Sequence, residues 1–316
     1  MGKISLSPWQ KKIVKSIISG NFLENHRIFK ALAHDIPFDL LIGQVEIDDL
    51  KLYISPHTLI PRPVTEILAE FTASIIKKAL LTKPLSRINI VDVGCGTGFA
   101  NLMILKKLFK PATLQKLAEI CTLFIDNVPQ ALELARKNFF ENLKKIHNVQ
   151  PTEQHKTPLN ILSIFKLMDA IFLSKNKLTT LIPHYSPRDL TVIFSNPPYV
   201  DIQELTTELL FENTNALITN EKFIQAILTL SSLSTTVSVI ETNPNWKLEK
   251  HREFLKIAHT CSSSNRLFFI REQAFHTNST LNPVIGYLVI NVKQLTNQDL
   301  LKICKTLPLE LEPLPN

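Results

Sequence analysis

The chain has 316 residues, of which 45% are hydrophobic and 20% charged, so it is long and apolar enough to bury a sizeable core. It has no run of about 18 uninterrupted apolar residues and therefore predicts no membrane-spanning helix. Its four cysteines never form a Cys-x-x-Cys pair, and none of its nine histidines has metal-ligand spacing, so we expect neither a disulfide framework nor a metal site. The net charge of +7 permits an acidic partner, but the basic residues are dispersed along the chain.

Residues 1–37 predict a small N-terminal helical region. This segment carries several lysines, has no arginine before Arg27, and has no acidic residue before Glu24. A basic start without acids is typical of organellar transit peptides, although a plain helix explains the same pattern. The expected compartment is therefore the mitochondrial matrix, with the cytoplasm as the alternative.

Residues 38–66 predict a β-hairpin followed by a linker. The stretch 38–56 has the pattern of two strands that meet near Asp48–Asp49, and the loop 57–66 is punctuated by two prolines. Thr65 is placed to cap a helix that follows the linker.

From Arg87 onward, short apolar runs alternate with helical patterns, which predicts a parallel sheet with helices on both faces. We expect this domain to span 67–295, followed by a C-terminal tail at 296–316 whose proline-punctuated end is frayed. The predicted strands are 88–93, 121–126, 159–164, 190–195, 235–242, 266–271 and 286–292. The predicted helices lie near 99–110, 129–144, 202–211, 221–232 and 247–260.

Three of the seven glycines, Gly94, Gly96 and Gly98, lie in one pentapeptide between a predicted strand and a predicted helix. Glycines permit a tight turn there and let backbone N–H groups approach a ligand at the helix N-terminus. The sixth position of the dinucleotide fingerprint is Phe99 rather than glycine or alanine, which disfavours NAD. Asp92 precedes this turn inside a buried strand end, where an acid is costly unless a cationic group pairs with it.

Asp126 ends the next predicted strand, where a carboxylate is well placed to bind ribose hydroxyls. The alternative is that Asp126 caps the helix that begins near Pro129. An acid-bearing glycine turn followed by a ribose-binding acid indicates a site for S-adenosylmethionine.

Residues 195–200, which read SNPPYV, follow an apolar strand and should lie at the carboxyl edge of the sheet, where ligands bind in open α/β folds. The Asn196 side-chain oxygen and the Pro197 carbonyl can accept the N–H groups of a planar amide or amine. They would aim its nitrogen at a sulfonium methyl, while Tyr199 packs on the planar group. The alternative is a turn that only ends the strand.

In this order, VDVGCGTG, DNVPQALELARKN and SNPPYV resemble class I S-adenosylmethionine-dependent methyltransferases that methylate amino groups. The stretches TLIPRPVTE and LLFENTNAL narrow this resemblance to the protein-(glutamine-N5) methyltransferase family, which acts on the Gly-Gly-Gln motif of peptide chain release factors. The resemblance covers roughly residues 30–292. It implies an α/β fold with a small N-terminal helical region, a β-hairpin linker and a seven-stranded Rossmann-like sheet.

The resemblance also implies roles for the matching residues. The implied catalytic residues are Asn196, Pro197 and Tyr199. The implied cofactor-binding residues are Asp92, Gly94, Gly96, Gly98, Asp126, Phe165 and Asn196. The implied substrate-binding residues are Arg62, Glu66 and Pro198. The chain departs from the family at Val64, where an acid is usual, and in the stretch ITNEKF, where glycines are usual. The acid expected after the third strand is also missing, and Ser163, Phe165 or Asp169 are the candidates to replace it.

We therefore expect an enzyme that transfers a methyl group from S-adenosylmethionine to the glutamine of a release factor. We expect it to act as a monomer, without direct nucleic-acid or membrane binding. The alternatives are a nucleic-acid amino-methyltransferase acting on adenine N6 or cytosine N4, and an inactive methyltransferase-like scaffold.

Overall fold

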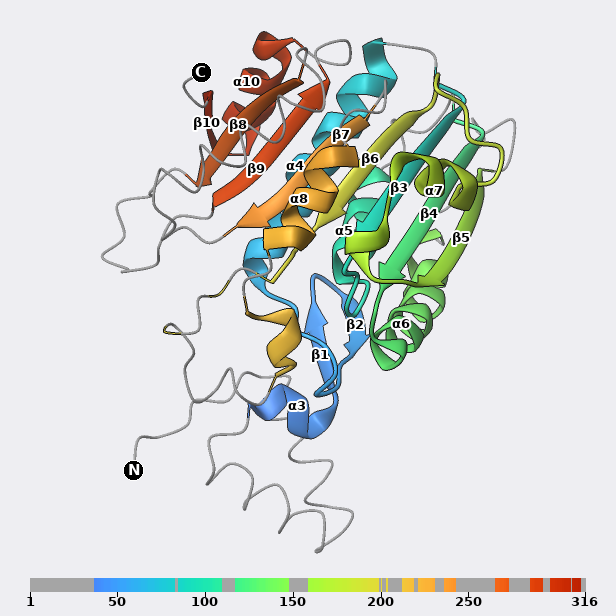
Figure 1. Ribbon diagram of the computed structural model, residues 1–316, viewed down its shortest axis with the longest axis vertical. Helices are drawn as coiled ribbons and strands as arrows, with labels where there is room; N and C mark the ends of the chain where they lie inside the picture. Colours follow the sequence, from blue (N-terminus) through green and yellow to red (C-terminus); the bar gives the residue numbers. More distant parts are fainter. Residues whose placement is uncertain are drawn as a thin grey trace, which may run out of the picture.

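Figure 1 presents the computed structural model of the chain, and its element labels are used below. The structure describes residues 37–82, 85–109, 117–147, 159–198, 200, 203, 212–218, 221–230, 236–242, 265–272, 285–291, 296–307 and 309–313. Residues 1–36, the predicted helix at 247–260 and almost all of the predicted helix at 202–211 lie outside this range.

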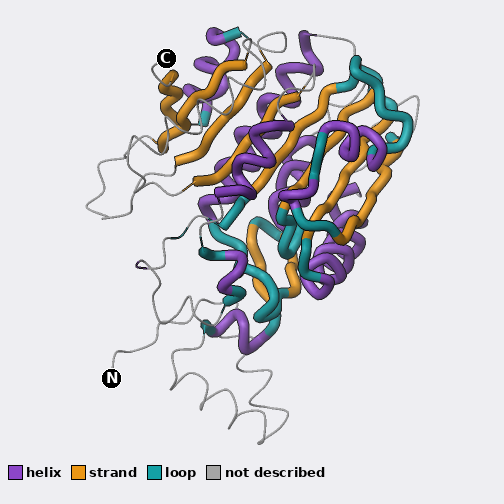
Figure 2. Tube along the Cα trace, in the orientation of Figure 1, coloured by secondary structure: helices purple, strands orange, loops and turns teal. Residues whose placement is uncertain are grey.

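A sheet of eight strands forms the centre of the described part, in the order β10-β8-β9-β7-β6-β3-β4-β5 (Figures 1 and 2). The five strands β7, β6, β3, β4 and β5 are mutually parallel. The other three pairings are antiparallel: β9 pairs with β7, β8 with β9, and β10 with β8. The strands are β3 (Arg87–Val93), β4 (Glu119–Asp126), β5 (Asn160–Leu167), β6 (Leu190–Ser195), β7 (Thr236–Thr242), β8 (Asn265–Glu272), β9 (Ile285–Asn291) and β10 (Leu309–Pro313). The predicted α/β class is confirmed, and each of the seven predicted strands overlaps an observed one. The count of seven was wrong, because β10 adds an eighth strand.

The helices and 3-10 turns cover both faces of the sheet, as its parallel part requires. In Figure 1, α4, α5 and α6 lie behind the sheet, and α7 and α8 lie in front of it. The helical elements are α3 (Phe38–Ile42), α4 (Pro63–Thr82), α5 (Phe99–Leu108), α6 (Pro129–His147), η1 (Ala170–Phe172), α7 (Lys175–Leu181), η4 (Thr214–Ala216), α8 (Glu221–Leu230) and α10 (Asn297–Thr306).

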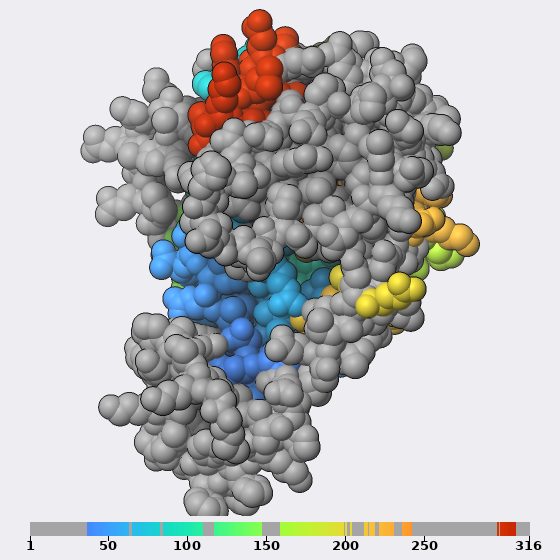
Figure 3. Space-filling view, turned by 90° about the vertical axis from the view of Figure 1, so that its left-hand side faces the viewer, coloured from blue at the N-terminus to red at the C-terminus, as the bar shows by residue number. Residues whose placement is uncertain are grey.

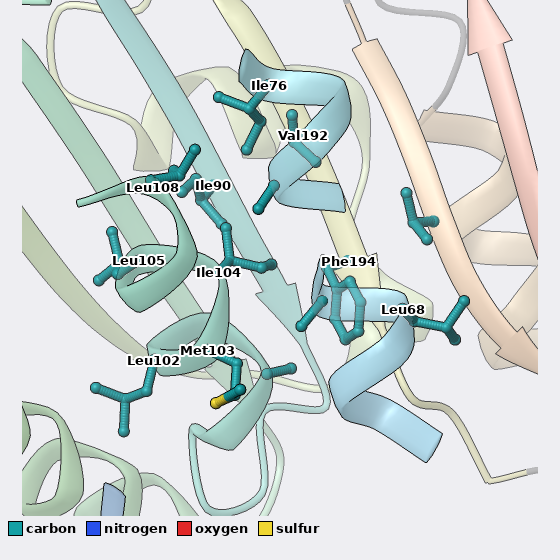
Figure 4. Packing of buried hydrophobic residues seen from close by; sticks show 14 of the residues in the cluster. Leu68, Ile76, Ile90, Leu102, Met103, Ile104, Leu105, Leu108, Val192 and Phe194 are labelled. Atoms are coloured by element: carbon teal, nitrogen blue, oxygen red, sulfur yellow. The ribbon is translucent and has the colours of Figure 1, made fainter. Parts of the chain in front are cut away.

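Alternation along the strands divides the core into two hydrophobic clusters. Ile90 of β3, with Val192 and Phe194 of β6, packs against α4 and α5 (Figure 4). The intervening side chains, such as Val91 and Ile193, pack on the opposite face against η1, α7 and α8. Successive strand residues point to opposite faces of the sheet. A polar residue two positions after a buried apolar residue therefore points to the same face as that residue. This rule decides where the site residues point.

The predicted hairpin is confirmed over β1 (Gln44–Ile47) and β2 (Leu50–Tyr53). Ile47 pairs with Leu50, and Asp48 and Asp49 form a two-residue turn with positive φ angles of 47° and 63°. Both central residues of a type I′ turn need positive φ, which aspartate tolerates better than most residues.

Two details of the predicted linker were wrong. Residues 38–42 form the short helix α3 rather than part of a strand, and the chain leaves this helix through Gly43 in the left-handed conformation. Thr65 is not a helix cap, because α4 already begins at Pro63, and proline is favoured in the first turn of a helix. Thr65 therefore lies inside that first turn, and its hydroxyl is available for other partners.

Two asparagines of α6 attach the hairpin to the sheet domain. Asn138 accepts a hydrogen bond from Tyr53 N at 2.7 Å and donates to Tyr53 O at 2.9 Å, so it pairs with β2 as a neighbouring strand would. Asn142 repeats this arrangement one helical turn later, accepting from Lys51 N at 3.1 Å and donating to Lys51 O at 2.8 Å. Asn138 also donates to Thr97 O at 2.9 Å, which ties the hairpin to the glycine turn.

The expectation of a frayed C-terminal tail was wrong for the described residues. Thr296 and Asp299 form a capping box at the start of α10, and β10 pairs with β8. Leu300, Ile303 and Cys304 of α10 are buried in the same cluster as α4 and α5. In the space-filling view, α10 (red) lies at the top of the visible face, and the hairpin region (blue) lies below its middle (Figure 3). Among the described residues, no helix is long and apolar enough to cross a membrane.

Candidate active site

A cavity lies at the carboxyl edge of the parallel strands, where β3, β4 and β6 end. Its lining includes residues from the glycine turn, from the ends of these strands, from the segment before α4 and from the segment 213–216. Among the residues predicted for the site, it brings together Arg62, Asp92, Gly94, Gly96, Asp126, Asn196 and Pro198.

The glycine turn connects β3 to α5 and is held against β4. The N–H groups of Gly94 and Cys95 both donate to Ile125 O, at 2.8 and 3.0 Å. Gly94 has φ +71°, and a Cβ on it would lie 3.0 Å from the Phe223 ring that shares the cavity lining. Glycine is therefore needed at this position both for the left-handed backbone and for the space in front of it.

Gly98 lies in the same turn but does not line the cavity, so its predicted cofactor role is not supported by its position. It is the N-cap residue of α5 with φ +75°. A Cβ there would lie 3.3 Å from the Ala135 Cβ of α6. The third glycine of the motif therefore serves close packing between helices.

Asp126 ends β4, and both of its carboxylate oxygens accept backbone hydrogen bonds. Oδ2 accepts from Gly96 N and Oδ1 accepts from Val128 N, each at 2.9 Å. Burial raises the pKa of Asp126, while the N–H groups of Val128 and Gly96 act in the opposite direction. Both donors lie outside α6, which begins at Pro129, so Asp126 does not cap that helix. A carboxylate has about four acceptor positions, so Asp126 can still accept a hydrogen bond from a ligand.

Asp92 continues the apolar series of β3 into the cavity and is only 2% exposed. Its Oδ2 atom has no hydrogen-bond partner among the described residues. Burial, assisted by the nearby charge of Asp126, raises the pKa of Asp92 to about 8. A buried carboxyl with an unpaired oxygen at a cavity wall is a place for a positively charged or hydrogen-donating ligand group.

Asn196 follows β6 directly and presents a polar amide to the same cavity. Its Nδ2 donates to Thr65 Oγ1 at 3.0 Å, and its Oδ1 is buried with no partner among the described residues. Pro198 lines the cavity, while Pro197 is buried outside the lining. Tyr199 lies outside the described residues, so its predicted role stays a prediction.

Arg62 reaches the cavity from the segment before α4 and forms an ion pair with Glu212. The Glu212 carboxylate also accepts from Ile60 N at 2.7 Å, and its side chain is only 2% exposed. This carboxylate therefore fixes the loop that bears Arg62 against the segment that follows residue 211. Glu212 lies in the LLFENTNAL stretch, but sequence reasoning gave it no role.

Glu66 and Phe165 were wrongly placed at the site. Glu66 lies one residue past Thr65 in α4 and pairs with Lys107, at 3.5 Å between Oε1 and Nζ, instead of lining the cavity. The Phe165 ring stacks on Phe124, with centroids 4.6 Å apart and planes inclined by 6°. Phe165 thereby belongs to the cluster on the α6 side of the sheet.

Asp169 lines the cavity in place of Phe165. It was among the candidates for the missing acid, and its Oδ1 accepts a hydrogen bond from Ile171 N at 3.0 Å at the start of η1. Within the part of the chain that the structure describes, no group of three or more potential metal ligands is present.

These observations define a doubly wound α/β protein with a cavity at the carboxyl edge of its sheet. No model of a known protein family matches the sequence. The chain is nevertheless similar to release factor glutamine methyltransferases, as its motifs indicated. The relative from Pasteurella multocida (strain Pm70) is 28% identical over 190 residues, which cover 59% of this chain and 54% of the relative. The relative from Escherichia coli (strain K12) is 29% identical over 212 residues, which cover 66% of this chain and 58% of the relative. The chain thus spans little more than half the length of these relatives.

Similar solved structures include precorrin-6y C5,15-methyltransferase from Geobacter metallireducens GS-15, with a TM-score of 0.37 and 14% sequence identity. That match covers 78% of this chain and 97% of the other. A TM-score this low adds nothing to the fold class, which rests on the strand order itself.

Proposed function

We propose that this protein transfers a methyl group from S-adenosylmethionine to the side-chain amide nitrogen of the glutamine in the Gly-Gly-Gln motif of a peptide chain release factor. The observation that carries the proposal is the buried, unpartnered Asn196 Oδ1 at a cavity that also contains two acids, Asp92 and Asp126. The names of the bacterial relatives support the class of substrate.

The residues around the cavity suit S-adenosylmethionine. No atom lies within 4 Å of a Cβ built on Gly96, so the turn is open to a ligand at that position, and the unpaired Asp92 oxygen suits a cationic amine. Asp126 keeps free lone pairs that can accept from ribose hydroxyls. The cofactor supplies a methyl group activated by its bond to a positively charged sulfur.

The chain's own contribution is to orient the substrate nitrogen. The lone pair of an amide nitrogen is delocalised into its carbonyl, so this nitrogen is a weak nucleophile. An acceptor that holds one N–H of the amide, as Asn196 Oδ1 would, fixes the plane of the group and favours positive charge developing on nitrogen. Transfer replaces one N–H proton by the methyl group, and the released proton carries away the positive charge that was on sulfur.

Arg62 and Pro198 are proposed to shape the entrance for the substrate glutamine, because both line the cavity on the side of the α4 segment and the β6 end. We further propose that the protein acts as a monomer. Mitochondrial import remains a prediction from residues 1–36, which lie outside the described range, and the bacterial relatives give it no support. A fluorescent reporter fused to residues 1–30 would test it.

The proposal is tested by supplying methyl-labelled S-adenosylmethionine with an intact release factor, with the same factor carrying alanine in place of the motif glutamine, and with single- and double-stranded DNA and RNA. We expect label on the intact factor and none on the alanine variant. Label on nucleic acid would instead support the amino-methyltransferase alternative. A protein that binds no cofactor by calorimetry and labels nothing would be an inactive scaffold.

A further inference from the structure

A chain of two hydrogen bonds runs from a buried acid to the proposed catalytic amide. Asn196 Nδ2 donates to Thr65 Oγ1 at 3.0 Å, and Thr65 Oγ1 donates to Glu241 Oε2 at 2.8 Å. Thr65 is 4% exposed and Glu241 is 1% exposed, so solvent does not substitute for either partner. Glu241 lies outside the sequence motifs of the site, and the sequence predicts only a helix cap for Thr65.

The fold brings these three residues together from three elements. Strands β6 and β7 are parallel, and Ser195 pairs with Ile240, so the next positions in this register are Asn196 and Glu241. Asn196 lies two positions after Phe194, and Glu241 lies two positions after Val239. Phe194 and Val239 both belong to the hydrophobic cluster that includes α4. The first turn of α4 lies over this edge and places Thr65 between them.

The direction of the two bonds follows from chemistry. Thr65 Oγ1 donates to Glu241 Oε2, and a threonine hydroxyl has only one proton to donate. Because that proton is given to Glu241, the Thr65 oxygen can only accept from Asn196. The asparagine therefore turns its NH₂ group toward Thr65, and its carbonyl oxygen, which has no partner among the described residues, points away from Thr65.

We infer that Glu241 and Thr65 are positioning residues that fix the rotamer of the Asn196 amide, so that an acceptor rather than a donor faces the substrate. The inference rests on the proposed function, because an acceptor is what an amide N–H needs. Rotation of the Asn196 amide by 180° would place its NH₂ against the NH₂ of the substrate, and two donors cannot pair. The orientation that Thr65 imposes leaves Oδ1 buried without a partner among the described residues, and a substrate N–H would satisfy it.

The test compares Thr65→Val, which removes the hydroxyl at nearly constant volume, with Thr65→Ser, which keeps it. We expect Thr65→Val to lower the single-turnover rate of methyl transfer about 10- to 100-fold, as for other residues that orient a catalytic group. Cofactor affinity should change less than about threefold, because neither bond in the chain involves the acids or glycines of the cofactor site. Thr65→Ser should restore most of the rate. A Thr65→Val protein that transfers methyl at the wild-type rate would overturn the inference.

A second measurement does not depend on activity or on the folding of the valine variant. The Asn196 side-chain NH₂ resonances, assigned by their loss in Asn196→Asp, report whether this group is hydrogen-bonded. We expect slow exchange of one Nδ2 proton in the wild type and faster exchange in Glu241→Gln, whose amide can donate to Thr65 and so permits both orientations. Exchange as fast as that of an exposed asparagine in the wild type would contradict the inference. If the wild type fails to methylate release factors but shows the protected proton, the proposed substrate is wrong and the positioning chain stands.

Discussion

Asp92 and Asp126 lie at the same cavity but differ in their partners. Asp126 satisfies the backbone N–H groups of Gly96 and Val128, whereas Asp92 keeps one buried oxygen unpaired. Because its pKa is raised from 3.8 to about 8, folded Asp92 holds a proton that the unfolded chain has released above pH 4. When the folded state binds the extra proton, the free energy of unfolding falls as the pH rises. The amount by which Asp92 lowers the free energy of unfolding of the ligand-free protein therefore grows from about pH 4 to about pH 8.

We predict that Asp92→Asn stabilises the ligand-free protein at pH 8 by on the order of a few kcal/mol, because asparagine never carries the charge whose burial raises the pKa of Asp92. The gain should shrink toward pH 5, where both side chains are neutral. Urea unfolding at the two pH values measures it. Asp126→Asn is the control and should destabilise, because one amide oxygen cannot replace two acceptors on opposite sides. An Asp92→Asn effect that is the same at both pH values would contradict the assignment.

At this scale the sequence predicted which residues come together at the cavity where that depends on local position, and their roles stay predictions. The glycine turn, Asp92, Asp126 and Asn196 sit beside strand ends, and the parallel sheet carries strand ends to one edge. The predicted places of Glu66 and Phe165 at the cavity were wrong. The direction of the Glu66 side chain depends on its position around α4, and that of Phe165 depends on its aromatic neighbours. Thr65 and Glu241 were not found, because their contact joins positions 176 residues apart.

At the scale of elements, the attachment of the hairpin depends on two buried asparagines at positions i and i+4 of α6. Asn142 bonds to the hairpin and to Asn138 O, whereas Asn138 also bonds to Thr97 O in the glycine turn. Both are fully buried, so neither residue can exchange its partners for water.

We predict that Asn138→Ala and Asn142→Ala each lower the free energy of unfolding by about 1–3 kcal/mol through lost and unsatisfied hydrogen bonds. Only Asn138→Ala should also weaken cofactor binding, because only Asn138 supports the turn that lines the cavity. Chemical denaturation and calorimetry on the two variants measure this contrast. Equal cofactor affinity in both variants would show that the glycine turn does not depend on Asn138.

The order and kind of the elements followed from periodicity, since buried parallel strands are short apolar runs separated by helices. The observed strand β6 has the predicted bounds, 190–195. The turn at Asp48–Asp49 was also predicted correctly, because two turn residues between two strand patterns are typical of a β-hairpin. The helix α3 was missed, because five residues are too few for a helical period to appear.

At the scale of the whole molecule, the C-terminal residues complete both the sheet and the core. Lys78 of α4 pairs with Asp299 of α10, at 3.1 Å between Nζ and Oδ1, and β10 extends the sheet beyond β8. Prolines near the end of the chain suggested an irregular tail, but an edge strand accepts proline where its N–H is not needed.

Two neighbouring leucines test this role of α10. Leu300 is 1% exposed in the main cluster, and Leu301 is 45% exposed. We predict that Leu300→Ala lowers the free energy of unfolding by about 2–5 kcal/mol, while Leu301→Ala changes it by less than about 0.5 kcal/mol. Urea unfolding of both variants decides the matter. Small and equal effects would mean that α10 does not belong to the core.

In the proposed function, the Asn196 carbonyl oxygen holds the substrate amide for methyl transfer. The most direct test measures, for wild type and Asn196→Ala, the single-turnover rate of methyl transfer to a release factor together with the affinity for S-adenosylmethionine and the melting temperature. We predict that Asn196→Ala lowers the rate by a factor of about 10²–10³, the loss typical of one pre-organised polar contact at a reacting centre. Cofactor affinity and melting temperature should change little, because the backbone of the motif is set by its prolines. An Asn196→Ala protein that melts early but transfers methyl at the wild-type rate per folded molecule would contradict the claim and leave the motif as a turn that ends a strand.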